Sequence, residues 1–179
     1  MKGIVANHRT KCLISKEEIQ KKVRELAERI SEDYNGKDLI CVGILNGAYM
    51  FYTDLTRNLD IDIQSYFLRF SSYTNNVREN KVAVILDVGF DPKGKHILII
   101  EDVIDTGNTF YQSDIVNRLK KMGAESVKVA TLISKPLKRE KEVQIDYVGF
   151  EIGDDFIYGY GLDIDDKGRN TEEIRCIID

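Results

Sequence analysis

The chain has 179 residues, of which 42% are hydrophobic and 31% are charged, and its formal net charge is −4 at pH 7. This composition indicates a folded globular domain and excludes a disordered chain. The acidic balance gives no overall positive field for nucleic acid or an anionic membrane, and no apolar run is long enough to cross a bilayer.

The cysteines and the N-terminal residues bear on the cellular compartment. Cys12, Cys41 and Cys176 are odd in number, far apart in the sequence and not at metal-ligand spacing. We interpret them as free thiols in a reducing compartment. The N-terminus carries no apolar segment of a secretion signal, so we expect a cytoplasmic protein.

The first predicted elements are a helix and a buried strand. Ser15 and Glu18 have the spacing of a capping box, and apolar residues recur at helical spacing between residues 19 and 30. The nearly unbroken apolar run over residues 39–45 then predicts a strand that is covered on both faces.

Helices and strands continue to alternate along the chain. The further predicted elements are a helix over 48–59, a strand over 61–70, a polar mobile loop or loose hairpin over 71–80, strands over 82–88 and 96–103, a helix over 109–122, and strands over 126–134 and 147–152. This alternation predicts a single α/β domain over residues 1–179, with a doubly wound, mostly parallel sheet.

Ligands of such folds bind beyond the carboxyl ends of the strands, and residues 97–109 are the main candidate there. A predicted buried strand delivers Glu101, Asp102 and Asp105, and the turn Thr106-Gly107-Asn108-Thr109 leads into a helix. The glycine can adopt positive φ, and the amides and hydroxyls of the turn suit a phosphate. The acids would repel a bare phosphate, but they suit a sugar phosphate whose hydroxyls and hard cation they hold. A capped helix start without a ligand is the alternative interpretation, and this pattern alone favours neither.

Two other phosphate-binding motifs are missing. The sequence has no Gly-x-x-x-x-Gly-Lys-Ser/Thr, so a P-loop NTPase is unsupported. Gly159-Tyr160-Gly161 is followed by Ile164 at the position where a dinucleotide fingerprint needs its third glycine.

Several segments in consistent order resemble the type I phosphoribosyltransferases. They are residues 43–49, residues 69–73, residues 97–109, Lys135, and residues 155–163 with Arg169 beyond them. The run Glu-Asp-Val-Ile-Asp-Thr-Gly-Asn-Thr is most similar to the hypoxanthine-guanine branch of that family. Each segment alone is a weak signal, and their conjunction is a strong one.

The resemblance implies a fold and a reaction. It implies a core over about residues 36–150, a small hood from residues 1–14 and 151–179 over the active site, and a flexible catalytic loop. The implied enzyme transfers the phosphoribosyl group of phosphoribosyl pyrophosphate to N9 of a 6-oxopurine, which yields IMP or GMP and pyrophosphate in purine salvage. Mg²⁺ is the implied cofactor, and a homodimer or homotetramer is the implied assembly.

The resemblance also assigns roles to individual residues. Asp105 is the expected general base, set against N7 of the purine. The expected contacts of phosphoribosyl pyrophosphate are Leu45, Asn46, Gly47, Arg69, Ser72, Tyr73, Glu101, Asp102, Asp105, Thr106, Gly107, Asn108, Thr109 and Arg169. The expected purine contacts are Lys135, Phe156, Ile157 and Asp163, and the expected magnesium ligands are Glu101, Asp102 and Asp163. The chemistry agrees, because an oxocarbenium-like transition state needs a base, anionic groups near the sugar and a cation on the leaving pyrophosphate.

The chain departs from the family pattern at two positions. Asn46 stands where many members carry lysine or another residue, and Asn108 stands where the pattern often has lysine or arginine. Backbone amides are the expected binding groups at both positions, so a side-chain role there is in doubt. The resemblance also implies a cis peptide bond between Leu45 and Asn46.

Two alternative functions stay open. A regulator of the same fold that binds RNA would need a basic face, and the candidate is the run Lys-Pro-Leu-Lys-Arg-Glu-Lys at residues 135–141. We interpret that run as a solvated connection between strands. A phosphoribosyltransferase for adenine, orotate or uracil would share the phosphate site but not the pairing of Lys135 with the hood. The use of guanine or xanthine beside hypoxanthine is open as well.

Overall fold

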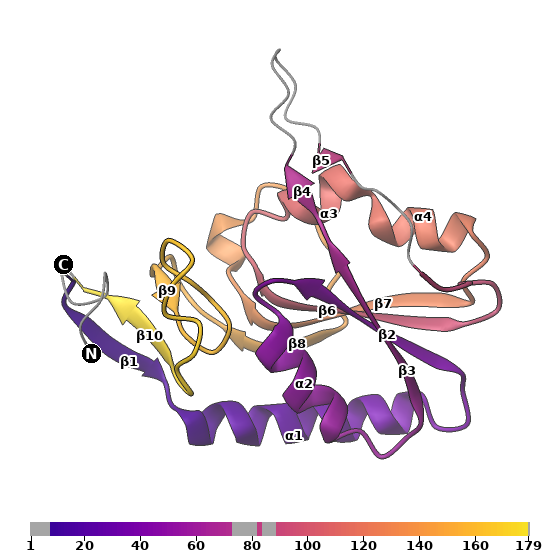
Figure 1. Cartoon of the computed structure of the whole chain (residues 1–179), viewed down its shortest axis with the longest axis horizontal. Helices are drawn as coiled ribbons and strands as arrows, with labels where there is room; N and C mark the ends of the chain where they lie inside the picture. The colour runs from indigo at the N-terminus through magenta and orange to yellow at the C-terminus, as the bar shows by residue number, and fades with distance from the viewer. Residues whose placement is uncertain (1–7, 73–81, 84–88, 179) are drawn as a thin grey trace, which may run out of the picture.

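The centre of the fold is a five-stranded parallel sheet (Figure 1). The structure is a computed structural model, and it describes residues 8–72, 82–83 and 89–178. The strand order is β3-β2-β6-β7-β8, and every adjacent pair is parallel. The strands are β2 Leu39–Leu45, β3 Ile63–Arg69, β6 His96–Ile104, β7 Ser126–Ser134 and β8 Tyr147–Glu151. The predicted doubly wound α/β class is therefore confirmed.

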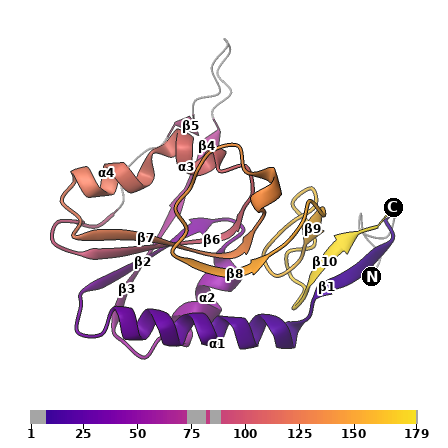
Figure 2. The ribbon, with the colours of Figure 1, turned by 180° about the vertical axis from the view of Figure 1, so that it is seen from behind.

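Helices cover both faces of the sheet, as Figures 1 and 2 show from opposite sides. Helices α1 (Lys16–Asp33) and α2 (Tyr49–Arg57) lie on one face, and α3 (Asn108–Ser113) and α4 (Ile115–Lys121) lie on the other. Successive residues of β2 serve both cores, because Cys41 packs with the first pair of helices and Val42 with the second. This two-sided burial explains the apolar run of the sequence.

Helix α1 begins at the predicted capping box. The Ser15 amide donates to Glu18 Oε2 at 2.8 Å, and the Glu18 amide donates to Ser15 Oγ at 3.3 Å. The buried face of the helix consists of Ile19, Val23, Leu26, Ala27 and Ile30. The predicted helix start and its apolar face are both confirmed.

The helix predicted over residues 109–122 is two helices, which corrects the sequence prediction. Asp114 lies between α3 and α4 with a φ of 50°, a left-handed conformation. The Ser113 hydroxyl donates to the Phe110 carbonyl at 3.3 Å and accepts from the Ile115 amide at 3.4 Å. These side-chain bonds compete with the helical backbone ladder, and aspartate tolerates the left-handed region better than most residues.

The polar segment after β3 is described only in part. Strand β4 (Ser71–Ser72) pairs antiparallel with β5 (Val82–Ala83). The rest of the predicted loop, residues 73–80, lies outside the described residues, as do residues 84–88 of the strand predicted over 82–88.

A second, antiparallel sheet joins the two ends of the chain (Figure 1). Its order is β1 (Thr10–Ile14), β10 (Ile174–Ile177) and β9 (Ile157–Tyr158). We call this sheet, with its connecting turns at residues 151–178, the hood. The hood contacts the helices of one face, because the Tyr160 hydroxyl donates to Asp54 Oδ2 of α2 at 2.6 Å and Lys16 of α1 pairs with Glu172.

The helices are too short or too polar to be bilayer spans. Within the described part of the chain, none combines the length and the hydropathy that crossing a membrane requires.

Removal of the Tyr160 hydroxyl should measure the strength of the bond between hood and core. The side chain is buried, and both burial and the Asp54 bond raise the pKa of Tyr160, so the phenol stays a donor. We expect Tyr160→Phe to lower the free energy of unfolding by about 1–3 kcal/mol, because the Asp54 carboxylate loses a partner. Urea denaturation measures this. The control is Tyr111→Phe, which removes the same group from a side chain that is 64% exposed. Equal stability of the two variants would contradict the expectation.

Candidate active site

The site begins at the carboxyl end of β6, in a turn that we call the phosphate loop, residues 104–109. Strand β6 ends at Ile104, Gly107 has a φ of 80°, and α3 begins at Asn108. Within the loop, the Thr106 amide donates to Asp105 Oδ1 at 2.6 Å, and the Asn108 amide donates to Thr106 Oγ1 at 3.3 Å. Helix α3 has only six residues, so the helix dipole contributes less than the sequence suggested. The amides and hydroxyls of the loop remain as the anion-binding groups.

The phosphate loop is supported from behind by residues 139–143, which we call the backing segment. The amides of Glu140 and Lys141 both donate to the Thr106 carbonyl, at 3.0 and 2.9 Å. A Cβ on Gly107 would lie 2.3 Å from the Lys141 carbonyl oxygen. A side chain at position 107 would therefore push the two segments apart, which explains the glycine there.

The two predicted acids of β6, Glu101 and Asp102, are buried just before this loop. Glu101 Oε1 accepts from the Asp102 amide at 3.1 Å, and Asp102 Oδ1 accepts from the Val103 amide at 2.9 Å. Burial raises the pKa of Glu101 well above its usual range, and the neighbouring Asp102 carboxylate adds to the shift. Burial also raises the pKa of Asp102, although hydrogen bonds from Glu101 and the Val103 amide oppose this. A nearby cation would reverse both shifts.

The turn after β2 packs directly against Asp102. The Leu45–Asn46 peptide bond of this turn is cis. A Cβ on Gly47 would lie 1.7 Å from Asp102 Oδ2, so only glycine fits. On its other side, a Cβ on Gly161 of the hood would lie 2.1 Å from the Gly47 carbonyl oxygen. The Gly47 turn is thus held between the buried acid and the hood.

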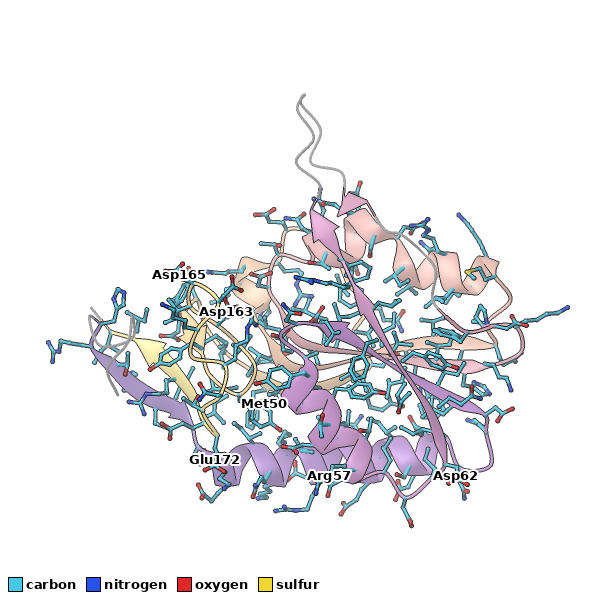
Figure 3. The ribbon with its side chains drawn as sticks, in the orientation of Figure 1. Met50, Arg57, Asp62, Asp163, Asp165 and Glu172 are labelled. Atoms are coloured by element: carbon cyan, nitrogen blue, oxygen red, sulfur yellow. The ribbon has the colours of Figure 1, made fainter. Side chains whose placement is uncertain are left out.

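The hood loop beside this turn contains Asp163 and Arg169, which are paired with each other. Arg169 Nη2 lies 2.8 Å from Asp163 Oδ1, and Arg169 Nη1 donates to the Gly161 carbonyl at 2.8 Å. Asp163 Oδ2 accepts from the Asp166 amide at 2.8 Å. In Figure 3, Asp163 and Asp165 lie together on this loop, and Met50 marks the first turn of α2 beside the hood.

Lys135 connects the end of β7 to the hood. Its side chain is buried, and Nζ donates to the Asp155 carbonyl at 2.6 Å. The next two residues are Phe156, which is 56% exposed, and Ile157, which is buried at the start of β9. Burial lowers the pKa of Lys135, and the charge of Lys138 adds to this, while the Asp105 carboxylate opposes it. The predicted purine residues Lys135, Phe156 and Ile157 therefore lie on two adjoining segments.

For some of the predicted site residues, the described part of the structure shows no side-chain contact with these groups. Arg69 ends β3 with an exposed side chain, and its backbone lies in register with Leu45. Only the backbone of Ser72 is described, and Tyr73 lies outside the described residues. The described residues also contain no group of three or more acids, histidines or cysteines placed to hold a metal ion. Glu101, Asp102 and Asp163 thus do not form a complete metal site by themselves.

The cavity beside these acids is not the larger of the two cavities near the phosphate loop. A cavity of about 20 Å³ lies among Glu101, Asp105, Gly107 and Thr109, whereas a larger one of about 370 Å³ lies between α4 and the backing segment. The larger cavity is lined by side chains such as Val129 and Val143, and neither Glu101 nor Asp102 lines it. We place the site at the smaller cavity, because Glu101 and the phosphate loop with Asp105 line it.

Sequence reasoning missed Arg139. Its guanidinium donates to the carbonyls of Ile104 and Asp105, at 2.9 and 2.7 Å. The run at residues 135–141, which the sequence suggested to be a solvated connection, thus faces the site in part. The only available signal was an arginine soon after a predicted strand end, which is not specific.

Comparisons with known proteins agree with this architecture. The family model of the phosphoribosyl transferase domain matches residues 13–165. The hypoxanthine-guanine phosphoribosyltransferase of Bacillus subtilis is 41% identical over 165 residues, which cover 92% of this chain and 91% of that protein. A crystal structure of a hypoxanthine phosphoribosyltransferase from Staphylococcus aureus superposes with a TM-score of 0.89 at 35% identity, over 99% of this chain and 96% of that one.

One group of relatives is much longer than this chain. The bifunctional protein TilS/HprT of Listeria monocytogenes is 41% identical over 92% of this chain, which spans only 25% of its length. The match of one family model over most of the chain, together with full-length relatives above 30% identity, decides the classification. This chain belongs to the phosphoribosyl transferase family.

Proposed function

We propose that this protein transfers the phosphoribosyl group of phosphoribosyl pyrophosphate to N9 of hypoxanthine, and also of guanine, with release of pyrophosphate. The observation that carries the proposal is Lys135, a buried ammonium that contacts the hood carbonyl next to Phe156. An ammonium only donates hydrogen bonds, so it suits the O6 acceptor of a 6-oxopurine. The relatives named above carry this activity in their names.

The 5′-phosphate and the pyrophosphate of the substrate would each contact a different turn. The phosphate loop would take the 5′-phosphate with its amides and the hydroxyls of Thr106 and Thr109, and its weak internal bond of 3.3 Å is one that an oxyanion can replace. The Gly47 turn, with Arg169 nearby, would take the pyrophosphate. Leu45, Asn46 and Arg69 at the adjoining strand ends complete this set.

The two buried acids fit a magnesium ion that arrives with the substrate. Carboxylates are hard oxygen ligands, and the phosphate and ribose oxygens would supply the remaining ones. Held there, Mg²⁺ would supply positive charge to offset the charge that develops on the leaving pyrophosphate. Glu101 and Asp102 would hold the ribose hydroxyls and the ion, and Asp163, oriented by Arg169, would approach from the hood.

Asp105 is the residue that we assign as general base. Its exposed carboxylate is fixed by the Thr106 amide and lies close enough to Lys135 to favour the charged ammonium. A purine whose O6 meets Lys135 would present N7 towards Asp105. Phe156 would stack on the ring, and the backbone of Ile157 would meet its edge.

The described residues of the basic run 135–141 do not form the basic face that the rival hypothesis, an RNA-binding regulator, requires. Within the described residues, Lys135 and Arg139 turn towards the hood and the phosphate loop, Lys138 pairs with Asp154 at 2.5 Å, and Lys141 lies over the Tyr111 ring. RNA binding needs such cations to face outward together.

Assembly and location belong to the proposal as well. Phe67 of the edge strand β3 is 46% exposed and packs on Tyr52 of α2, with ring centroids 4.5 Å apart. An exposed aromatic at an open sheet edge is compatible with the proposed homodimer or homotetramer, which sedimentation would measure. The cysteines are free thiols, which suits a reducing cytoplasm.

The deciding experiment is an assay of the unmodified protein. It is incubated with phosphoribosyl pyrophosphate, Mg²⁺ and, separately, hypoxanthine, guanine, xanthine, adenine or uracil, and nucleotide formation is followed by chromatography. We expect IMP and GMP. Nucleotide from adenine or uracil alone would assign the enzyme to another branch of the family.

Asp105→Asn should separate catalysis from binding. Asparagine keeps the size and hydrogen-bonding capacity of the side chain but removes its basicity. We expect turnover to fall by about 10²-fold or more, with little change in the affinity for phosphoribosyl pyrophosphate. Steady-state kinetics and calorimetry measure the two quantities. Asp91→Asn, in an exposed turn where the side chain accepts from the Lys93 amide, is the control. Full activity of Asp105→Asn would place the base elsewhere.

Lys135 should determine the choice of base. Adenine presents an amino group to the ammonium, so both donors would lose water without gaining a bond. We expect kcat/KM for hypoxanthine to exceed that for adenine by about 10²-fold or more. Lys135→Ala should lower the rate and bring the two bases within about 10-fold of each other. Lys95→Ala, which removes a lysine paired with Asp38 at the other end of β6, should preserve the preference. Similar rates for both bases in the unmodified protein would refute the role of Lys135.

A further inference from the structure

Arg139 is the one residue of the basic run whose charge lies directly beneath the phosphate loop. Its Nε donates to the Asp105 carbonyl at 2.7 Å. Its Nη2 donates to the Ile104 carbonyl at 2.9 Å and to Ser134 Oγ at 3.2 Å. The guanidinium therefore bridges the end of β6, the next residue of the loop (Asp105) and the last residue of β7.

Local structure brings the side chain to this position. Residues Pro136–Lys138 form one turn of 3₁₀-helix after β7, and the Arg139 amide closes it on the Pro136 carbonyl at 3.2 Å. The turn directs the chain back under the loop, where the Glu140 and Lys141 amides meet the Thr106 carbonyl. The Arg139 side chain also approaches the space that a Cβ on Gly107 would occupy, at 3.3 Å.

The two carbonyls that Arg139 holds belong to two consecutive peptide groups. The N–H groups of those peptides are the amides of Asp105 and Thr106. In a trans peptide the N–H points opposite to the C=O, so a donor on the carbonyl side fixes the N–H groups towards the other side. The Asp105 carboxylate lies on that other side, where it accepts from the Thr106 amide at 2.6 Å.

The charge of Arg139 also acts on this backbone. Among the described residues its partners are neutral oxygens, two carbonyls and a hydroxyl, and no carboxylate pairs with it. A cation on the carbonyl end polarises each peptide and makes its N–H a stronger donor. The loop thereby becomes a better site for an anion without direct contact between arginine and ligand.

We propose that Arg139 is a positioning residue of the phosphate loop: its side chain holds the Ile104 and Asp105 carbonyls so that Asp105 and the loop amides face the substrate. The kinetic consequences rest on the proposed function. Arginine is required because its planar fork donates to two adjacent carbonyls at once, whereas the lysine ammonium is a single point on a flexible stem.

The test compares Arg139→Lys and Arg139→Ala with Lys141→Ala. The control removes a positive charge from the same run but keeps the backbone amide that donates to the Thr106 carbonyl. The Lys141 side chain lies away from that bond, over the Tyr111 ring, 4.7 Å from the centroid. With phosphoribosyl pyrophosphate, Mg²⁺ and hypoxanthine, we expect both Arg139 variants to lose about 10–10²-fold in kcat. The KM for phosphoribosyl pyrophosphate should rise while that for hypoxanthine changes little. Lys141→Ala should keep both constants.

Chemical rescue separates positioning from a purely structural role. Millimolar guanidinium should raise the turnover of Arg139→Ala several-fold and leave the unmodified protein unchanged. It should not rescue Arg139→Lys, where the ammonium fills the space. Wild-type kinetics in Arg139→Lys, or no effect of guanidinium on folded Arg139→Ala, would overturn the proposal. If Arg139→Ala does not fold, the lysine variant supplies the kinetic test.

Hydrogen exchange tests the positioning without any assumption about the reaction. In Arg139→Lys, the amides of residues 105–108 and those of Glu140 and Lys141 should exchange faster, while β6 itself keeps its protection. Unchanged exchange in both segments would refute the role of Arg139 even in an active enzyme. Absence of nucleotide formation by the unmodified protein would instead refute the proposed function, and the exchange result would still decide the inference about Arg139.

Discussion

Parallel pairing of β6 with β2 on one side and β7 on the other is the constraint on which the candidate site depends. Parallel strands end at the same edge of a sheet, so the residues that follow them are brought together although they are distant in the sequence. The Gly47 turn follows β2, the phosphate loop follows β6, and Lys135 follows β7. If one of these neighbouring strands ran antiparallel to β6, the residues that follow it would lie at the opposite edge of the sheet. The full length of β6, 9 residues, would then separate them from the phosphate loop.

Two glycines allow the hood to pack closely against this edge of the sheet. The Gly47 turn approaches Asp102 so closely that no side chain fits, and Gly161 approaches the Gly47 carbonyl in the same way. Tyr160, at a φ of 48°, lies between two glycines of positive φ and is held by Asp54. A left-handed tyrosine is costly in isolation and persists because its surroundings fix it. The hood therefore meets the sheet edge by close backbone contact between Gly161 and the Gly47 carbonyl.

The sequence predicted what depends on local pattern and missed what depends on distant partners. The strands were predictable because burial on both faces makes an apolar run, and the start of α1 because Ser15 and Glu18 are only three residues apart. The break at Asp114 was missed because the amphipathic pattern continues through it and only the Ser113 hydroxyl ends the first helix. Of the candidate site, the acids and the phosphate loop are one continuous segment, so the sequence alone could propose them together. The support that Arg139 gives to that segment crosses from β7 to β6, and no spacing in the sequence encodes it.

The ionisable groups Glu101, Asp102 and Lys135 of the candidate site are all buried and therefore poorly solvated. Burial raises the pKa of Glu101 and Asp102 and lowers that of Lys135, so each group is pushed towards its neutral form. A cation against the acids and an acceptor oxygen against the ammonium would restore the charged forms at both ends. Asp163 and Arg169 differ, because they form an ion pair with each other at 2.8 Å. The site thus combines an ion pair in the hood with charges on the sheet edge that hydrogen-bond to backbone groups. A magnesium-bound sugar phosphate and a 6-oxopurine together would bring a cation to the acids and an acceptor oxygen to the ammonium.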